Sequence, residues 1–146
     1  MKELARLRKR RSKPKIVFTN GCFDILHTGH ISTLERAKSL GDILIVALNA
    51  DASVQRLKGP TRPIHSLEAR QRVMAALGCV DYVTSFDQNT PLELILELQP
   101  DWIAKGGDWD ISQIVGALEA KAWGGKGKSL KFIEGHSTTQ TVAKIA

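Results

Sequence analysis

Residues 15–30 read KIVFTNGCFDILHTGH, and this stretch joins an apolar run to a turn that carries two histidines. The run at 15–20 has the continuous apolar character of a central strand in a parallel sheet. Thr28 is a typical N-cap residue, so a helix is expected to begin there. His27 precedes this cap and His30 lies in the first helical turn. The sequence therefore predicts a strand, a turn and a helix in direct succession.

The rest of the chain alternates short apolar runs with amphipathic stretches. Strands are expected at 15–20, 43–49, 81–86, 101–107 and 129–134, helices at 28–40, 67–77, 90–98 and 138–146, and a loose segment at 123–129. Alternating strands and helices within one domain predict an α/β fold with a doubly wound, five-stranded parallel sheet and right-handed crossovers. Ligands of such sheets bind beyond the carboxyl ends of the strands.

Length and composition are those of one globular domain. The 146 residues are enough for a sizeable core. No apolar run approaches the roughly 20 residues that span a membrane, and no signal-peptide pattern is present. We therefore expect a cytoplasmic protein with no membrane segment. Cys22 and Cys79 are far apart in the sequence, so neither a disulfide framework nor a zinc knuckle is predicted.

The net charge of +6 is concentrated at the N-terminus. Residues 1–15 hold eight basic side chains and one acidic, a net of +7, which leaves 13 basic and 14 acidic groups, a net of −1, for the remaining 131 residues. We interpret residues 1–14 as a basic leader, solvated or briefly helical, and residues 15–146 as a single domain. A basic arm can bind nucleic acid or anionic membrane, but the near-neutral domain favours neither partner.

Two familiar phosphate-binding motifs are absent from this chain. The pattern G-x-G-x-x-G would follow the first strand, where the chain reads GCFDIL instead. GGKGKS at 124–129 imitates the end of a Walker A loop, but Ala122 stands where the first glycine belongs. That segment also leads into a strand rather than from a strand into a helix. Any phosphate site must therefore be built differently.

The turn after the first strand supplies such a site. Asn20, Gly21, Cys22 and Phe23 offer backbone N–H groups to an anion, and Gly21 permits close approach. The helix that follows brings free N–H groups and the positive end of its dipole. Two imidazoles beside a helix N-terminus predict a site for a polyphosphate.

Three later segments follow other strand ends. RLKGPTRPI carries Lys58 and Arg62 on a proline-stiffened loop. KGGDW offers Lys105 as a cation, Gly106 for backbone approach and Asp108 as an acceptor for a base or ribose. HSTTQ opens the last helix with the hydroxyls of Ser137, Thr138 and Thr139. All three fall at the sheet edge where a ligand is expected.

Other interpretations of the histidines remain open at this level. His27 and His30 are potential zinc ligands with Asp24 as a third, although Gly29 and a chain reversal between them make the spacing unusual. A purely structural role for both rings is a second alternative. A third is a nucleotide-sensing or nucleic-acid-binding protein that uses the basic arm.

These motifs carry a family resemblance. TNGCFDILHTGH with its HxGH core, LNADASVQRLKGPTRPI, KGGDW and GHSTTQ resemble, in order and spacing, the nucleotidyltransferases of the cytidylyltransferase-like superfamily, from Lys15 to Ala146. The chain is most similar to the D-glycero-β-D-manno-heptose 1-phosphate adenylyltransferases. Glycerol-3-phosphate cytidylyltransferases carry an arginine and a lysine where this chain has Phe132 and Gln140. The resemblance implies a three-layer, Rossmann-like nucleotidyltransferase fold.

The resemblance also implies an activity. It is the transfer of AMP from ATP to D-glycero-D-manno-heptose 1-phosphate, giving ADP-heptose and pyrophosphate for lipopolysaccharide or surface-glycan synthesis. The alternative is a cytidylyltransferase for glycerol 3-phosphate or a similar polyol or amino-alcohol phosphate. The expected partners are ATP with Mg²⁺ and a sugar phosphate, and a homodimer is expected because relatives are commonly dimers. With no sugar-kinase domain before residue 1, a stand-alone transferase is expected.

The resemblance assigns roles to residues of this sequence. His30 would donate to the α-phosphate, His27 would hold the bridging or β-phosphate, and Lys58 would align the phosphates. Arg70 either contacts the sugar phosphate or braces the neighbouring loop. The nucleotide-binding set is Asn20, Gly21, Cys22, Phe23, His27, His30, Lys105, Gly106, Asp108, Ser137, Thr138 and Thr139. The acceptor-binding set is Asp24, Lys58, Arg62 and Arg70, and no residue is assigned to a metal.

Overall fold

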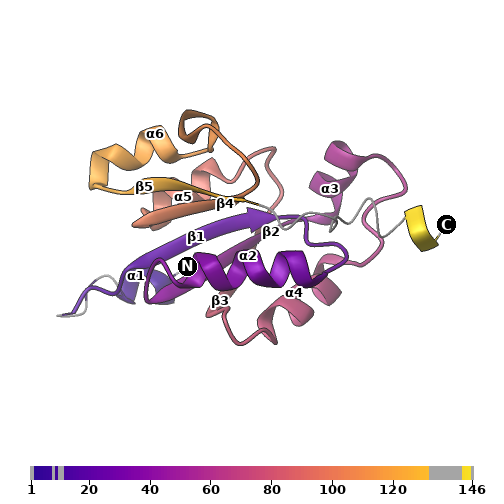
Figure 1. Cartoon of the computed structure of the whole chain (residues 1–146), viewed down its shortest axis with the longest axis horizontal. Helices are drawn as coiled ribbons and strands as arrows, with labels where there is room; N and C mark the ends of the chain where they lie inside the picture. Colours follow the sequence, from indigo (N-terminus) through magenta and orange to yellow (C-terminus); the bar gives the residue numbers. More distant parts are fainter. Residues whose placement is uncertain (1, 8, 10–11, 132–142, 146) are drawn as a thin grey trace.

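The computed structural model describes residues 2–7, 9, 12–131 and 143–145 of the chain. It contains one parallel sheet of five strands, β1 (Ile16–Gly21), β2 (Ile43–Asn49), β3 (Tyr82–Phe86), β4 (Trp102–Gly106) and β5 (Lys126–Leu130). The strand order is β3-β2-β1-β4-β5, so the chain winds outward from β1 in both directions (Figure 1). The doubly wound, five-stranded parallel sheet that the sequence predicts is confirmed.

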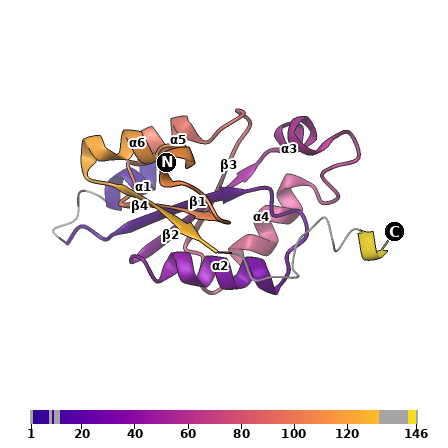
Figure 2. The ribbon, with the colours of Figure 1, turned by 45° about the horizontal axis from the view of Figure 1, so that its top comes forward.

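Helices cover both faces of this sheet. Helices α2 (Thr28–Lys38) and α4 (Leu67–Ala75) lie on one face, and α5 (Leu92–Leu98) and α6 (Ala117–Ala120) lie on the other (Figure 2). Helix α3 (Asp51–Lys58) lies beyond the carboxyl end of β2 (Figure 1). The remaining helical elements are α1 (Lys2–Leu7), η1 (Ile111–Gln113) and η2 (Lys121–Trp123).

The two central strands are buried on both faces. Ile16 and Phe18 of β1 pack into the core on the α5 and α6 side, whereas Val17 packs into the core on the α2 and α4 side. Residues 44–48 of β2 are fully buried. A strand covered by helices on both faces needs apolar residues at successive positions, which explains the continuous apolar runs. These runs are the reason that β1 and β2 could be predicted from the sequence.

The fifth strand corrects the sequence prediction. A strand was expected at 129–134 after a loose segment at 123–129, but β5 spans Lys126–Leu130 and residues 132–142 lie outside the described range. A Cβ on Gly127 would lie 3.0 Å from Cβ of Ala117 and 3.1 Å from Cγ2 of Ile111. Glycine is present because α6 and η1 pack directly on the strand backbone. Tertiary packing therefore overrides the flexibility that the composition suggests.

Helix α3 corrects a second prediction, the one for the segment after β2. The sequence placed Lys58 on a loop, but Lys58 is the last residue of α3, which Gly59 ends at a φ of 100°. The helices expected at 28–40, 67–77 and 90–98 agree with α2, α4 and α5 to within a few residues, whereas α6, η1 and η2 were not predicted. Of the expected helix at 138–146, the described residues 143–145 are helical.

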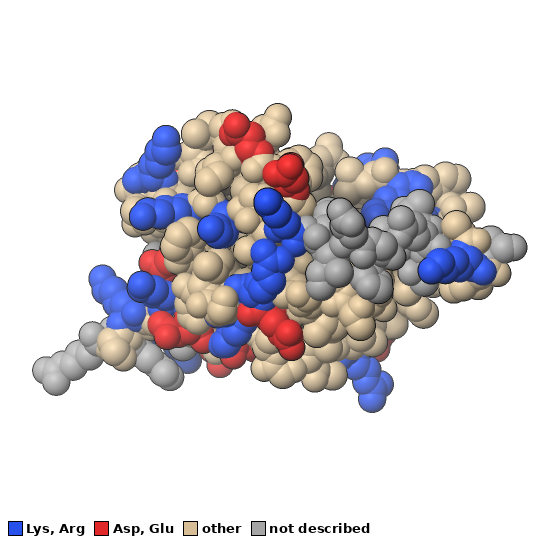
Figure 3. Space-filling model, viewed as in Figure 1, with Lys and Arg blue, Asp and Glu red and all other residues tan. Residues whose placement is uncertain are grey.

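The described helices and the charges on one face of the surface bear on membrane insertion and on nucleic-acid binding. None of the helices in this part of the chain is long and apolar enough to cross a bilayer. Figure 3 shows Lys and Arg interspersed with Asp and Glu on the face that carries α2 and β5. On this face the charges of the described residues are mixed, and no continuous basic patch is visible in Figure 3.

Candidate active site

A cavity of about 500 Å³ opens at the carboxyl edge of the sheet. The turn after β1 and the end of β4 both line it, and these are the strands between which the strand order reverses. The remaining lining comes from the first turns of α2, the end of α3 and the segments after β3 and β4. Doubly wound sheets bind their ligands at this point of reversal.

The turn after β1 is shaped by a close contact between its own residues. Phe23 has a φ of 46°, in the left-handed region that non-glycine residues rarely adopt. A Cβ on Gly21 would lie 2.9 Å from Cε2 of the Phe23 ring. The Phe23 ring in turn meets the His30 ring edge-on, with centroids 5.4 Å apart. Glycine at position 21 therefore leaves room for the aromatic ring that supports His30.

The two histidines form the N-terminal cap of α2. His27, not Thr28, is the N-cap residue, because its Nδ1 accepts the backbone N–H of Gly29 at 3.1 Å. His30 Nδ1 accepts the backbone N–H of His27 at 3.3 Å, which completes a reciprocal capping box. In a neutral imidazole whose Nδ1 is an acceptor, the proton lies on Nε2. Both rings therefore carry Nε2–H donors.

The environment keeps His30 neutral. The rings of His27 and His30 stack with centroids 3.9 Å apart and planes 25° apart. Burial, the neighbouring His27 and the nearby Lys58 lower the pKa of His30 to about 4. At neutral pH this imidazole is a hydrogen-bond donor without a full charge, placed on the cavity wall. His27 itself does not line the cavity and supports His30 from behind.

Asp24 is buried, and its carboxylate is hydrogen-bonded to other residues of the chain. Its carboxylate accepts from Arg62 Nε at 2.8 Å, from the backbone N–H of Ile64 at 2.8 Å and from that of His65 at 2.9 Å. Burial alone would raise the pKa of Asp24, but the His65 and Ile64 N–H groups and the Arg62 guanidinium outweigh it and lower the pKa. Asp24 thus ties the segment after α3 to the turn after β1.

This arrangement contradicts the zinc interpretation. Nδ1 of both histidines accepts a backbone N–H, and the Asp24 oxygens accept three donors of their own. Within the described ranges, no group of three or more His, Cys, Asp or Glu side chains is placed to hold a metal ion. A catalytic zinc site normally has three such protein ligands.

Arg70 acts as a brace between three segments. Its Nη1 donates to the carbonyls of Cys22 at 2.9 Å and Asn49 at 2.8 Å, its Nε donates to the carbonyl of His65, and its Nη2 pairs with Asp51 at 2.7 Å. The side chain is 1% exposed and does not line the cavity. Of the two roles that the sequence left open for Arg70, the geometry supports the bracing role.

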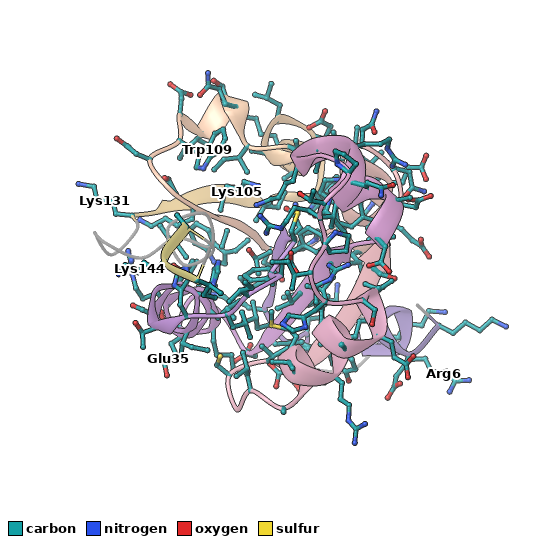
Figure 4. The ribbon with its side chains drawn as sticks, turned by 90° about the vertical axis from the view of Figure 1, so that its right-hand side faces the viewer. Arg6, Glu35, Lys105, Trp109, Lys131 and Lys144 are labelled. Carbon is teal, nitrogen blue, oxygen red and sulfur yellow. The ribbon has the colours of Figure 1, made fainter. Side chains whose placement is uncertain are left out.

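Two lysines bring positive charge to the cavity. Lys58 reaches it from the end of α3 and Lys105 from the end of β4. Burial lowers the pKa of Lys105, and its Nζ lies 5.6 Å from the centroid of the Trp109 ring (Figure 4). Trp109 Nε1 donates to the carbonyl of Gly106 at 2.9 Å, which fixes the ring beside the strand end. The cavity therefore presents one cation from the end of α3 and a second from the end of β4.

Cys22 lines the same cavity as an uncharged thiol. Burial is the largest influence and raises its pKa, although Lys58, Arg70 and Arg62 act in the opposite direction. A thiol with a raised pKa is a poor nucleophile at neutral pH. The cavity chemistry is therefore that of binding and hydrogen-bond donation rather than of covalent attack by Cys22.

The predicted site residues divide into three groups. Those that line the cavity are Asn20, Gly21, Cys22, Phe23, Asp24, His30, Lys58, Lys105 and Gly106. Those that lie outside its lining are His27, Arg62, Arg70 and Asp108. Ser137, Thr138 and Thr139 fall outside the described residues.

The segment after β3 was missed by the sequence analysis. Phe86, Asn89, Thr90 and Pro91 line the cavity, as does Trp109 after β4. The signal was available, because DQNTP directly follows a predicted strand and carboxyl ends of parallel strands share one edge. It was overlooked because amides and hydroxyls in a loop are ordinary turn residues.

Comparisons with known proteins agree with this architecture. Residues 18–143 match the family model described as cytidylyltransferase-like. The chain is 57% identical over 136 residues to the bifunctional protein HldE of Pseudomonas putida strain GB-1, and 58% identical over 131 residues to that of Pseudomonas fluorescens strain Pf0-1. These matches cover 93% and 90% of this chain. The chain spans only 29% and 28% of the length of these relatives.

Solved structures share the fold. The lipopolysaccharide core biosynthesis protein of Thermoplasma volcanium GSS1 is 29% identical with a TM-score of 0.67, covering 82% of this chain and 97% of that one. Pantoate-beta-alanine ligase of Francisella tularensis, at 18% identity and a TM-score of 0.59, covers 89% of this chain and 64% of the ligase. The ligase match shows the fold alone.

Proposed function

The chain belongs to the cytidylyltransferase-like family, and we propose that it transfers AMP from ATP to D-glycero-D-manno-heptose 1-phosphate. The products are ADP-heptose and pyrophosphate. The observation that carries this proposal is the neutral His30, whose Nε2–H donor lies on the wall of a cavity beside Lys58 at the point of strand reversal. A donor of this kind is suited to charge that builds on a phosphate oxygen.

The identity of the acceptor rests on the relatives. The HldE proteins match most of this chain at more than half of its positions, and a solved structural neighbour is a lipopolysaccharide core biosynthesis protein. The HxGH motif and the segment LNADASVQRLKGPTRPI resemble the heptose 1-phosphate type of the superfamily. We therefore assign the product to the synthesis of lipopolysaccharide or a similar surface glycan.

The reaction is an in-line displacement at phosphorus. An oxygen of the sugar phosphate forms a bond to the α-phosphorus of ATP, while the bond from the α-phosphorus to the bridging oxygen breaks and pyrophosphate leaves. The attacking oxygen is already ionised, so no side chain has to remove a proton. Catalysis then consists of alignment and charge stabilisation.

Several of the predicted site residues have a role in this scheme. His30 Nε2–H donates to a non-bridging oxygen of the α-phosphate, and the backbone N–H groups of the turn at 20–23 face the phosphates. Lys58 aligns the acceptor phosphate with the triphosphate. His27 holds His30 in its tautomer and orientation, and we retain a phosphate contact for its Nε2 as part of the proposal. Ser137, Thr138 and Thr139 are proposed to hold the β- and γ-phosphates.

The nucleoside has its own part of the cavity in this scheme. Lys105, Gly106 and Trp109 at the end of β4 lie on the other side of the strand reversal from Lys58. An aromatic ring fixed by a hydrogen bond offers a flat surface for the adenosine, and Asp108 is retained as a proposed acceptor for the base or ribose. Release of pyrophosphate from ATP but not CTP would support this assignment.

Mg²⁺ is proposed to enter with ATP. Phosphate oxygens are ligands that Mg²⁺ prefers, and the ion usually binds through substrate phosphates with few protein ligands. It would neutralise charge on the leaving pyrophosphate. Titration of activity with EDTA and restoration by MgCl₂ tests this assignment.

The cellular setting follows from the substrates. ATP and sugar phosphates are cytoplasmic metabolites, so we propose that the reaction takes place in the cytoplasm. We also propose a homodimer, on the basis of the family resemblance. Light scattering coupled to gel filtration, at micromolar protein, distinguishes a dimer of about twice the 16.0 kDa chain mass from a monomer.

A pyrophosphate-release screen tests the activity. ATP and CTP are each combined with heptose 1-phosphate, mannose 1-phosphate, glycerol 3-phosphate and ethanolamine phosphate. The proposed function expects release that requires both ATP and the heptose 1-phosphate. Release from CTP with glycerol 3-phosphate would instead identify the polyol cytidylyltransferase, and release with no pair would overturn the assignment.

A further inference from the structure

The wall of the cavity next to α3 is formed by a short loop that the mechanism above does not use. This loop, residues 87–91, connects β3 to α5. Asn89, Thr90 and Pro91 line the cavity, together with Leu57 and Lys58 at the end of α3. The loop therefore adjoins the lysine that is assigned to the acceptor phosphate.

Helix α3 holds this loop in place through two sets of contacts. Arg56 Nε donates to Asn89 Oδ1 at 3.3 Å, and its Nη2 contacts the carbonyl of Asp87. Ser53 Oγ donates to the carbonyl of Gln88 at 3.4 Å and accepts from the buried Asn49 Nδ2 at 2.9 Å. The loop and Lys58 thus belong to one packed unit.

These contacts leave particular groups for a ligand. Asn89 lines the cavity, and because its Oδ1 accepts from Arg56, its Nδ2 amide is left as a donor for a ligand. The neighbouring Thr90 hydroxyl can both donate and accept. Pairs of this kind suit the hydroxyl groups of a polyol, which also donate and accept.

The residues assigned to the acceptor by the sequence are engaged elsewhere. Asp24 and Arg62 are paired with each other, and Arg70 braces the turn after β1 from outside the cavity. Lys58, in contrast, lines the cavity, and the proposed mechanism assigns it only to the alignment of the phosphates. A sugar bound through its phosphate to Lys58 would lie against the loop at 87–91.

The charges around this wall select against a cationic acceptor. Asp24 is the one carboxylate among the described residues that line the cavity, and it is 1% exposed and fully engaged. Asp87 lies in the loop but faces Arg56 and does not line the cavity. The Trp109 ring is already approached by the Lys105 ammonium. Among the described side chains that line the cavity, no free carboxylate is available to pair with an ammonium group on the acceptor.

We propose that the loop between β3 and α5 is the acceptor-specificity wall, where Asn89 and Thr90 bind the hydroxyls of an uncharged polyol or sugar whose phosphate is held by Lys58. This inference rests on the proposed function. It adds that the side chains of this wall offer no free carboxylate to the ammonium group of an amino-alcohol phosphate. It also moves acceptor recognition from Asp24, Arg62 and Arg70 to the segment after β3.

Two variants that remove polar groups, and one matched control, test the assignment of the wall. Thr90→Val removes the hydroxyl, and Asn89→Ala removes the Nδ2 donor together with the Oδ1 that accepts from Arg56. Each should raise KM for heptose 1-phosphate about threefold to tenfold, since an uncharged hydrogen bond to the ligand contributes that factor. KM for ATP should change less than twofold. Gln88→Ala is the control, because Gln88 is exposed in the same loop and does not line the cavity. It should leave both constants unchanged.

A charge variant tests the selectivity. Asn89→Asp keeps an oxygen for Arg56 but replaces the Nδ2 donor with an anion. It should reduce kcat/KM for heptose 1-phosphate. The kcat/KM for ethanolamine phosphate, divided by that for heptose 1-phosphate, should rise at least tenfold. Circular dichroism and the melting temperature check that each variant is folded.

The outcomes separate the inference from the function. In one outcome the wild-type protein is active, and the folded variants Asn89→Ala and Thr90→Val leave KM for the acceptor unchanged. The assignment of the loop as the acceptor-specificity wall is then wrong, while the proposed activity stands. An equal rise in KM for ATP would place the loop at the nucleotide and also overturn the wall. If the wild-type protein releases no pyrophosphate with any acceptor, the activity and the wall fail together.

Discussion

His27 and His30 cap the same helix and stack on each other. The backbone N–H of His27 donates to Nδ1 of His30 at 3.3 Å, and the ring centroids lie 3.9 Å apart. The contact directs both Nε2–H donors away from the backbone, and the neighbouring His27 contributes to the lowered pKa of His30. The side chains that cap the helix are thus the same pair to which we assign phosphate binding.

Replacing His30 by alanine should nearly abolish turnover. Removal of a preorganised donor typically reduces kcat by about 10² to 10³, or roughly 2.7–4 kcal/mol of transition-state stabilisation. Steady-state rates of pyrophosphate release measure the effect, with circular dichroism as the folding control. A folded His30→Ala that keeps more than half of wild-type turnover would contradict the assigned role.

Lys58→Met should lower kcat/KM for the sugar phosphate by about 10- to 100-fold, because a hydrogen bond to a charged group contributes roughly 1.5–3 kcal/mol. Lys128→Met is the matched control, since Lys128 lies exposed on β5 outside the cavity lining. Kinetics with varied sugar phosphate at saturating ATP give the comparison. Equal losses in the two variants would show that general surface charge, not Lys58, is responsible.

NMR at neutral pH should find His30 with its proton on Nε2, because its Nδ1 accepts the backbone N–H of His27. Long-range ¹H–¹⁵N spectra of ¹⁵N-histidine protein distinguish the tautomers directly. His30 should titrate with a pKa of about 4 in the free protein. Binding of an ATP analogue should raise the pKa of His30, because the phosphate charge favours the imidazolium. A free-protein pKa of His30 near 6.5 would contradict the buried, stacked environment.

Folding stability should decrease as the pH falls from about 6.5 to about 4. In that window an unfolded His30 binds a proton while the folded His30, with its pKa lowered to about 4, does not. The unfolded state then binds more protons, so the free energy of unfolding rises with pH. Urea unfolding of wild type and His30→Gln at several pH values measures the slope. His30→Gln should show a shallower slope, and identical slopes would exclude His30 as the cause.

Asp24→Asn should be strongly destabilising. It leaves the Arg62 guanidinium, 12% exposed, without its anionic partner, and breaking a buried pair in this way costs about 3–5 kcal/mol. Asp87→Asn is the matched control, because the Asp87–Arg56 pair is exposed and such pairs contribute about 0–1 kcal/mol. The two free energies of unfolding in urea provide the test. Similar small losses in both would show that the Asp24 pair is not a structural anchor.

Local patterns in the sequence determined the main architecture. Ile16–Phe18 and the run at 44–48 are apolar at successive positions, and this is required of strands that helices cover on both faces. The alternation with amphipathic stretches then allowed a parallel sheet to be predicted, and its carboxyl edge brought the HxGH turn, Lys58 and Lys105 to one place. Such periodicities are visible because they involve neighbours along the chain.

The tertiary structure alone decided which polar groups are engaged and which face the cavity. Asp24 meets Arg62 across 38 positions and Arg70 meets Cys22 across 48, so no local pattern reveals that these residues are engaged with the fold. Gly127 belongs to a strand because α6 and η1 pack on its backbone. Contacts between residues distant in sequence depend on how the elements pack, and that packing gives the loop after β3 its place at the cavity.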